Sequence, residues 1–266
     1  MAAAHCADQM SRRNARPVGR KIGFTNTNIW PEYNIDASNW GYIYANTQKT
    51  SKATGVATLP LNPRAEALQP KIEPEIVFRM KSAPSSSMSD AELLDCIYSF
   101  AHGLEIVQSI YHDWKFNSAE TTAQGALHRY LFIGNWLRLT PEMPKEQIVA
   151  ALGRIEVDIF RDHELMDRGS SKNVLGHPLN ALRHLCGILE KQALHPHVQP
   201  GELITTGTMT KALPISPGEY WQSFIKENDS LRLAGGYGQL NTLKLNVEKT
   251  ELNLFRRFRQ SAEPGL

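Results

Sequence analysis

The sequence predicts an α+β fold that is rich in β-strand, and three observations indicate it. Apolar runs of strand length recur along the chain, from residues 21–25 to residues 240–247. Polar and apolar side chains alternate cleanly over 154–160, which is typical of a strand with one buried face. Helical spacing of apolar residues is found in two segments, 89–103 and 178–192. We therefore expect a structure made mainly of sheet, with few helices.

The N-terminal part is expected to hold short elements. Residues 1–20 are polar and basic and contain helix-breaking Pro and Gly, so we expect a short lead-in. A short strand over 21–25 then opens into a turn. The dense aromatic residues over 30–44 are more typical of a lid or pocket wall than of a helix or strand, although a satellite of the core is the alternative. Residues 46–70 predict loops and an edge strand.

The middle of the chain is expected to contain one helix between strands. A Ser/Pro linker over 81–87 precedes Ser89, whose acidic neighbours make it a helix-start signal. Apolar residues at helical spacing continue the helix to Gly103, which opens the strand 103–107. A further apolar strand is expected over 131–134.

The second half predicts alternating strands with one helix. The strand 154–160 leads through a turn to a partner strand, and Pro178 begins the amphipathic helix 178–192. Residues 201–208 form a strand that ends in a Thr/Gly turn, whose backbone N–H groups are suited to hold a carboxylate. The last strand is expected over 240–247.

Composition limits the classes of function. With 41% hydrophobic and 21% charged residues, the chain fits one domain over 21–255 and a tail over 256–266. A net charge of +2 gives no basic field for nucleic acid, and no apolar run approaches the roughly 18 residues of a membrane span. Three cysteines without a C-x-x-C pair suit a reducing compartment. We expect a cytoplasmic protein with small-molecule partners.

Two carboxylates lie two positions apart in the apolar run 72–78. Side chains on a strand alternate between faces, so Glu73 and Glu75 point to the same side. Carboxylates this close repel each other unless a cation lies between them, and a hard divalent ion is the usual solution. Glu105, on the strand 103–107, is suited to complete a set of three. Alone, the Glu-x-Glu pattern is more often a solvated outer face.

Other chemistries have weaker signals. The chain has no G-x-S-x-G elbow and no G-x-x-x-x-G-K-[ST] loop. The glycines of 235–238 predict a turn rather than a dinucleotide loop, and the His-Pro-His of 195–197 lacks further ligands at metal-site spacing. His102, His112 and His128 flank the Glu105 segment, where each is a candidate acid or base, although a structural histidine is the commoner case.

Several motifs, in order and at the expected spacing, resemble one known family. They are Lys21 to Thr25, Glu73 to Ile76, Gly103 to Ser109, Asp113 to Lys115, Asn173 to Leu179, Gly201 to Thr208 and Pro217 to Glu219. This series is similar to the 2-keto-4-pentenoate hydratase group of the fumarylacetoacetate hydrolase superfamily. The resemblance runs from about residue 19 to about residue 247 and implies a mixed β-sheet roll with flanking helices.

The resemblance also implies a site and a reaction. The family's three carboxylates match Glu73, Glu75 and Glu105, which would hold Mg²⁺ or Mn²⁺ against the carboxylate and 2-oxo oxygens of a 2-oxo acid and stabilise its enolate. The family lysine matches Lys21, and the substrate-side turn matches residues 206–208, which are Thr206, Gly207 and Thr208. A hydratase would ketonise a 2-hydroxydienoate and then add water to the resulting 2-oxo-enoate. A homo-oligomer, a dimer or larger, is implied as well.

The chain departs from the family pattern at two positions that matter for proton transfer. The acidic position some eighteen residues after the family lysine is Asn39 here, and an amide on the substrate side cannot exchange protons as a carboxylate does. Glu120 is a candidate for a displaced catalytic partner. Alternatives to hydration therefore stay open: decarboxylation of a vinylogous 2-oxo acid, C–C hydrolysis of an acylpyruvate, or a non-catalytic member of the family.

Overall fold

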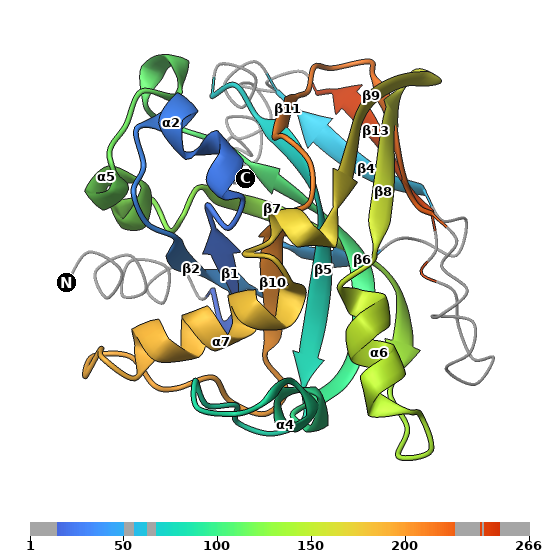
Figure 1. Ribbon diagram of the computed structural model, residues 1–266. Helices are drawn as coiled ribbons and strands as arrows, with labels where there is room; N and C mark the ends of the chain where they lie inside the picture. The colour runs from blue at the N-terminus through green and yellow to red at the C-terminus, as the bar shows by residue number, and fades with distance from the viewer. Residues whose placement is uncertain (1–14, 51–55, 63–67, 227–239, 241, 251–266) are drawn as a thin grey trace, which may run out of the picture.

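Two sheets form the scaffold of the molecule (Figure 1). The larger sheet runs in the order β2 (Asn39–Tyr44), β1 (Pro17–Gly23), β10 (Leu203–Thr208), β5 (Lys71–Met80), β6 (Ile97–Val107), β7 (His128–Arg138) and β3 (Gln48–Thr50), with β11 (Leu213–Pro214) paired to β5. The smaller sheet runs in the order β4 (Val56–Leu61), β13 (Leu243–Lys249), β12 (Tyr220–Ile225), β8 (Glu156–Arg161) and β9 (Glu164–Ser170). The computed structural model describes residues 15–50, 56–62, 68–226, 240 and 242–250.

The helices are short and lie around the sheets (Figure 1). They are α2 (Trp30–Tyr33), α4 (Asp90–Asp95), α5 (Ser118–Ala123), α6 (Lys145–Leu152) and α7 (Pro178–Leu189), with 3-10 turns at Thr27–Ile29, His112–Trp114 and Ser171–Asn173. Within the described residues, no helix is long and apolar enough to cross a membrane.

The larger sheet curls into a roll. β3 follows β2 in the chain and pairs in parallel with β7 at the opposite edge of the sheet. This pairing brings the two edges of the larger sheet together. One sheet face therefore points into the roll. At one end the interior is apolar, because side chains from five strands fill it: Ile43, Val77, Ala101, Leu131, Ile133 and Leu203. The charged residues of the candidate site lie on this same face, on β1, β5 and β6.

The outer face of the roll is covered by helices and by the smaller sheet. Leu182 and Leu185 of α7 pack in one buried cluster with Phe78 and Phe100 of the central strands. A second cluster joins the two sheets, with Ile72, Leu104 and Phe132 from the larger and Leu59, Trp221 and Leu245 from the smaller. These two clusters hold β5 and β6 from behind, which fixes the strands that carry the glutamates.

Most of the expected elements are confirmed, and the fold class is that of a mixed, strand-rich structure. The helix at Pro178, the strand at 201–208 and the hairpin after 154–160 all form as expected. The edge strand expected within 46–70 is β4, which pairs with β13 alone. The predicted turn at 235–238 and tail at 256–266 lie outside the described residues.

Three expectations about elements are wrong. The helix beginning after Ser89 ends at Asp95 and not at Gly103, because Ile97 and Phe100 pair with β5. The aromatic segment 30–44 contains the helix α2 and the strand β2, although the alternative of a satellite of the core is confirmed for Tyr33 and Ile35, which pack in a separate buried cluster. The first strand begins at Pro17 rather than Lys21, so the end of the expected lead-in belongs to the sheet.

Candidate active site

Two neighbouring strands bring the three glutamates together. Glu73 and Glu75 lie on one face of β5, and Glu105 lies directly opposite Glu73 in the antiparallel register of β5 and β6. One carboxylate oxygen from each residue lies within 4.8 Å of the other two. Directly opposed strand residues have neighbouring Cβ atoms, so this register places the carboxylates side by side without a special loop.

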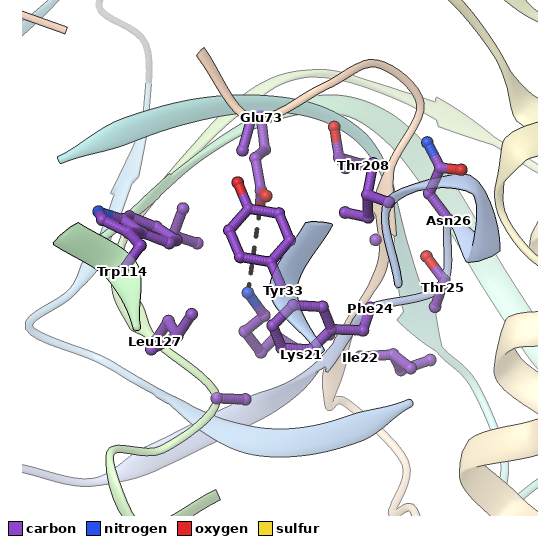
Figure 2. A pocket seen from close by; sticks show the side chains of 16 residues that line it. Lys21, Ile22, Phe24, Thr25, Asn26, Tyr33, Glu73, Trp114, Leu127 and Thr208 are labelled. Carbon is purple, nitrogen blue, oxygen red and sulfur yellow. Dashed lines mark ion pairs between the residues drawn. The ribbon is translucent and has the colours of Figure 1, made fainter. Parts of the chain in front are cut away.

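Lys21 supplies the positive charge in this cluster. It lies on β1, which is separated from β5 only by β10. Its Nζ lies 2.8 Å from Glu105 Oε2 and 4.0 Å from Glu73 Oε2. Figure 2 shows the Lys21 side chain extended toward Glu73 across the pocket. The side chain of Lys21 is 4% exposed, so the ammonium is compensated by these carboxylates rather than by water.

His128 holds Glu105 from the other side. Its Nδ1 lies 2.6 Å from Glu105 Oε1, and its Nε2 lies 2.8 Å from the hydroxyl of Thr47. The Thr47 hydroxyl also donates to the carbonyl of Tyr44 and accepts from its N–H group. Both ring nitrogens of a buried histidine are thus engaged, which fixes the ring beside the carboxylate. Of the three flanking histidines, only His128 contacts a glutamate of the site: His112 pairs with Asp113, and His102 bonds Ser223.

A bulge in β10 positions Glu75. The register of β10 against β5 shifts between Thr205 and Thr208, so the strand carries one residue more than its partner there. Gly207 lies in this bulge at φ +93°, and its N–H group donates to Glu75 Oε2 at 3.0 Å. The expectation that this turn holds a carboxylate thus fits the structure, but the carboxylate belongs to the protein itself.

Charge in the site is distributed unevenly. Burial raises the pKa of Glu73 to about 7, with Lys21 opposing this shift, and raises the pKa of Glu75 well above 4.5. Burial also acts to raise the pKa of Glu105, but Lys21 and His128 outweigh it and hold that pKa at about 2. Burial would lower the pKa of Lys21, yet the three glutamates outweigh it and raise it. One glutamate is therefore firmly ionised, and the other two favour a proton or another cation.

The residues present fit a divalent cation. Three carboxylates face one ammonium, so full ionisation leaves two negative charges that Lys21 does not balance. Glu75 Oε1 is buried and has no hydrogen-bond partner among the described residues, an arrangement that is costly unless a cation takes it up. Three carboxylate oxygens are the hard ligands that Mg²⁺ and Mn²⁺ prefer. Glu73, Glu75 and Glu105 are the residues that would hold such an ion.

A pocket opens above the charged cluster (Figure 2). Lys21 and Glu73 reach it from inside the roll, and its walls include Phe24, Tyr33, Trp114 and Leu127. These aromatic rings contact one another, and the indole N–H of Trp114 donates to the carbonyl of Gln69. The site is therefore a small charged floor with apolar walls, which is typical of a site for a small ligand.

One lysine that contacts two of the pocket residues was not anticipated from the sequence. Lys71 lies on β5, and its Nζ donates to the hydroxyl of Tyr33 at 2.8 Å. The ammonium lies 4.0 Å from the centre of the Trp114 ring and 5.1 Å from that of Tyr33. Burial lowers the pKa of Lys71, and the charges of Glu32 and Glu73 oppose this. Burial raises the pKa of Tyr33, which keeps its hydroxyl protonated.

The structure brings some of the predicted substrate-side residues to the pocket and leaves others outside it. Gly207 and Thr208 line the pocket, whereas Thr206 is buried behind it and donates to the carbonyl of Ile76. Asn39 is a neighbour of Gly23 across β1 and β2 and donates to the hydroxyl of Thr121. Asn39 is not among the pocket residues.

Glu120 is not brought to the site. It is the third residue of α5, where its carboxylate accepts from the N–H group of Asn117 in a capping box. This is a local structural role that fully accounts for an acidic residue at this position. The expectation of a displaced catalytic partner at Glu120 is therefore not supported by the geometry.

Comparison with known proteins places the chain in a family. The family described as fumarylacetoacetate (FAA) hydrolase C-terminal matches residues 30–247, which is most of the chain. The chain belongs to this family. The resemblance inferred from the motifs is thus confirmed by an independent match over nearly the same range.

Relatives in the FAA hydrolase family are named as lyases of small acids. A 2-keto-4-pentenoate hydratase from Paraburkholderia xenovorans (strain LB400) is 27% identical over 228 residues, covering 85% of this chain and 78% of that protein. A 4-oxalocrotonate decarboxylase from Pseudomonas sp is 26% identical over 206 residues, covering 77% of this chain and 73% of that protein. The expectation that the chain is an enzyme of this family is confirmed.

A solved structure shows the same fold. The 4-oxalocrotonate decarboxylase from Pseudomonas putida G7, complexed with magnesium and adipate, superimposes with a TM-score of 0.73 at 20% identity. The match covers 92% of this chain and 83% of that chain. The fold expected from the sequence, a mixed sheet roll of the fumarylacetoacetate hydrolase type, is confirmed.

Proposed function

We propose that the protein is a divalent-metal-dependent lyase, a hydratase that acts on a 2-hydroxydienoate or 2-oxo-enoate acid. The observation that carries this proposal is the buried set of Glu73, Glu75 and Glu105 around Lys21 at the floor of a pocket. The curated relatives support it, because they include a hydratase for an acid of this kind. A cytoplasmic location and a homo-oligomer stay predictions from the composition and the resemblance.

Mg²⁺ or Mn²⁺, held by the three glutamates, would supply stabilisation for the negative charge that develops at the 2-oxo oxygen of the substrate. Lys21 would hold a proton at Nζ beside that charge, because its pKa is raised by the same glutamates. Gly207 and Thr208, from the bulge of β10, line the pocket and would border the substrate. The aromatic walls would exclude bulk water and orient the carbon chain.

Hydration divides into two balanced steps. In the first, the 2-hydroxydienoate gives up its enol O–H proton and accepts a proton at the terminal carbon, which gives the conjugated 2-oxo-enoate. In the second, water adds across the remaining double bond, with its hydroxyl on C4 and its hydrogen on C3. Both steps pass through negative charge at the 2-oxo oxygen, which Lys21 and the glutamate site would stabilise.

Decarboxylation of a vinylogous 2-oxo acid is the second candidate, and one observation favours it. Water addition needs a base for the attacking water, and neither Asn39 nor Glu120 supplies one in the pocket. Loss of CO₂ leaves the electron pair in the same enolate and then needs only a proton on carbon. A 4-oxalocrotonate decarboxylase is among the curated relatives, which is consistent with this reaction.

The test is a spectroscopic assay combined with metal analysis. The protein is stripped with EDTA and reloaded with Mg²⁺ or Mn²⁺. It is then given, in separate assays, a 2-hydroxydienoate and a 2-oxo-enedioate. In each assay the ultraviolet absorbance of the substrate and the release of CO₂ are followed together. Loss of absorbance without CO₂ indicates hydration, and stoichiometric CO₂ from a 2-oxo-enedioate indicates decarboxylation. No metal-dependent turnover of either substrate would contradict the proposal.

Glu105→Gln is the matching variant. The amide keeps the shape of the side chain but removes a ligand charge, so we expect turnover to fall below detection and metal affinity to fall at least 100-fold, while the protein stays folded. Glu164→Gln is the control, because Glu164 is exposed on β9 and is not among the pocket residues. Full activity in Glu105→Gln would exclude the glutamate site as the catalytic centre.

A further inference from the structure

A groove separate from the candidate active site opens at the other end of the central strands. Its volume is about 440 Å³, which is in the range of sites for small organic ligands. α4 and α6 contact each other there, at the end of the sheet where β5 ends and β6 begins (Figure 1). Tyr98 of the groove lies at the start of β6 and Glu105 near its end, so roughly 20 Å of strand separates the groove from the glutamates. Among the described residues, none lines both the groove and the active-site pocket.

The floor of the groove is apolar. Four buried side chains line it, from α4, from the start of β6, from the loop before α6 and from α6 itself: Leu94, Ile97, Met143 and Ile148. All four belong to the core cluster that packs behind β5 and β6. The core therefore holds the floor in place, and an apolar group that binds there is removed from water.

The rim of the groove carries an excess of positive charge. Its charged residues are Lys81, Asp95, Arg138 and Lys145. Lys145 Nζ lies 2.6 Å from Asp95 Oδ2, so these two charges balance each other. Lys81 and Arg138 form no ion pair with an acidic side chain in the part of the chain that the structure describes. Two cations beside the apolar floor are thus left for an anion from outside.

The guanidinium of Arg138 has a defined orientation. It lies 4.9 Å from the centre of the Tyr98 ring, on the neighbouring strand. An arginine that stacks on an aromatic face keeps the edge of its guanidinium open, and that edge donates two parallel hydrogen bonds to a carboxylate. Stacking on Tyr98 therefore prepares Arg138 for an anion of this shape.

We propose that the groove binds a small amphipathic carboxylate, with its carboxylate on Arg138 and Lys81 and its apolar body on the floor. Solvation at the surface is the usual role of exposed cations, and it accounts for Lys145 and Asp95. It does not account for an open apolar floor beside two unbalanced cations, because exposed apolar surface with a polar rim is typical of a binding site. A neutral ligand would leave the cations unused, and a polyanion would leave the floor uncovered. The inference does not rest on the proposed function.

The experiment compares octanoate with octanamide, which has the same chain and no charge. Binding of each to the full-length protein with Mg²⁺ present is measured by calorimetry. We expect one octanoate per chain, bound at least 10-fold more tightly than octanamide, because the paired contact with Arg138 requires an anion. Butanoate should bind at least 10-fold more weakly than octanoate, since it lacks four methylene groups that would cover the floor.

Substitutions at the rim test the contact with the carboxylate. Arg138→Met and Lys81→Met each remove one cation, so we expect each to weaken octanoate binding about 10-fold and to change octanamide binding less than about 3-fold. Both residues are exposed, so both variants should stay folded. Arg138→Lys keeps the charge without the planar fork, and its affinity should be intermediate.

Arg129→Met is the matched control. Arg129 is also an arginine of β7 that stacks on a tyrosine, 4.6 Å from the centre of the Tyr130 ring, but it does not line the groove. It should leave octanoate affinity unchanged. Glu105→Gln should leave it unchanged as well, which shows that octanoate does not bind at the glutamate site.

The outcomes decide for or against the groove. A preference for octanoate over octanamide that is lost in Arg138→Met and kept in Arg129→Met supports the inference. Equal affinity of wild type for the two ligands, equal effects of the two arginine substitutions, or loss of octanoate binding in Glu105→Gln overturns it. If a second copy of the chain covers the groove instead, wild type binds no octanoate and Lys81→Glu changes the sedimentation coefficient, which overturns it too. Metal-dependent turnover tests the proposed function separately.

Discussion

At the scale of single residues, the site is governed by how each carboxylate is compensated. Glu105 has an ammonium on one oxygen and a histidine on the other, and its pKa is lowered to about 2. Glu75 has a single N–H donor from Gly207, and its pKa is raised. The three glutamates are alike in sequence, yet Glu105 is the fixed anion and its neighbours are the groups that respond to a metal.

His128→Gln tests the support of Glu105. Glutamine can still donate a hydrogen bond, but it lacks the second ring nitrogen that Thr47 holds. We expect Mg²⁺ affinity to fall about 10- to 100-fold, as is usual when a residue behind a metal ligand is changed. Calorimetric titration with Mg²⁺ measures this loss.

His112→Gln is the control for this prediction, because His112 is exposed and pairs with Asp113. Its Mg²⁺ affinity should equal that of wild type. An unchanged affinity in His128→Gln would mean that Glu105 is held by Lys21 alone.

The sequence predicts some of these residues and not others. Alternation along a strand places Glu73 and Glu75 on one face, and this prediction depends on local sequence only. The approach of His128 to Glu105 depends on the register of β6 and β7, and the approach of Lys71 to Tyr33 depends on the packing of α2 on the sheet. No local pattern encodes either contact, so sequence reasoning left His128 as one of three candidates and did not find Lys71 or Thr47.

At the scale of elements, the strand pair β5 and β10 combines two irregularities. Pro74 lies within the central strand β5 and has no N–H group to donate to a neighbour. The bulge of β10 lies next to it, where the register shifts and Met209 donates to the carbonyl of Pro74. The same bulge turns the N–H group of Gly207 toward Glu75 rather than toward a strand partner. A break in regular pairing therefore creates the hydrogen bond that fixes one glutamate.

Gly207→Ala tests the role of this bulge. Its φ of +93° disfavours any side chain, and a Cβ would collide with the Thr25 hydroxyl and approach the Ile22 carbonyl to 3.1 Å. We expect a loss of stability of about 2–4 kcal/mol and Mg²⁺ affinity at least 10-fold weaker, since the collision displaces the backbone N–H group that donates to Glu75. Chemical denaturation and calorimetry measure the two effects.

Gly218→Ala is a matched control, because Gly218 has the same φ of +93° and, among the described residues beyond its chain neighbours, no atom lies within 4 Å of the position that an added methyl group would take. Its free energy of unfolding should fall only by the cost of the backbone conformation, about 1–2 kcal/mol, and its Mg²⁺ affinity should not change. Equal effects of the two substitutions would show that the collision at Gly207 is unimportant.

Element boundaries show where sequence patterns are ambiguous. The helix 178–192 has an apolar face of regular helical period and a proline at its start, and it forms almost as expected. The run after Ser89 fits a helix as far as its capping box, but Ile97 and Phe100 fit the alternation of a strand equally well. Pairing of Ile97 with Met80 and of Phe100 with Phe78 of β5 makes this run a strand. That pairing is a long-range contact, which the local pattern does not contain.

At the scale of the whole molecule, the site makes stability depend on pH and on metal. The pKa of Glu73 is about 7 in the folded, metal-free protein and about 4.5 when unfolded, so the folded state holds a proton that the unfolded state releases between these values. Stability of the metal-free protein therefore falls as pH rises through this window, by at most about 3 kcal/mol from Glu73. Glu105 affects stability only at lower pH, because its pKa is lowered to about 2 in the folded protein. Its stabilising contribution is lost as the pH falls toward that value.

A divalent cation replaces those protons, so its effect should grow with pH. We expect saturating Mg²⁺ to raise the melting temperature more at pH 8 than at pH 5.5, because protons compete for the ligands at the lower pH. Thermal unfolding with EDTA and with Mg²⁺ at both pH values measures the difference. An equal Mg²⁺ effect at both pH values, or none, would count against metal binding by these carboxylates.

The parallel pairing of β1 with β10 has a consequence for biosynthesis. Gly19 pairs with Leu203, so the segment that carries Lys21 leaves the ribosome long before β10, one of its two neighbours in the sheet, exists. Until then β10 is missing from its place between β1 and β5, so Lys21 is not yet held beside the acidic strands, and the high contact order of this pairing makes it slow to form. Catalytic competence should therefore appear only when the last third of the polypeptide has been translated.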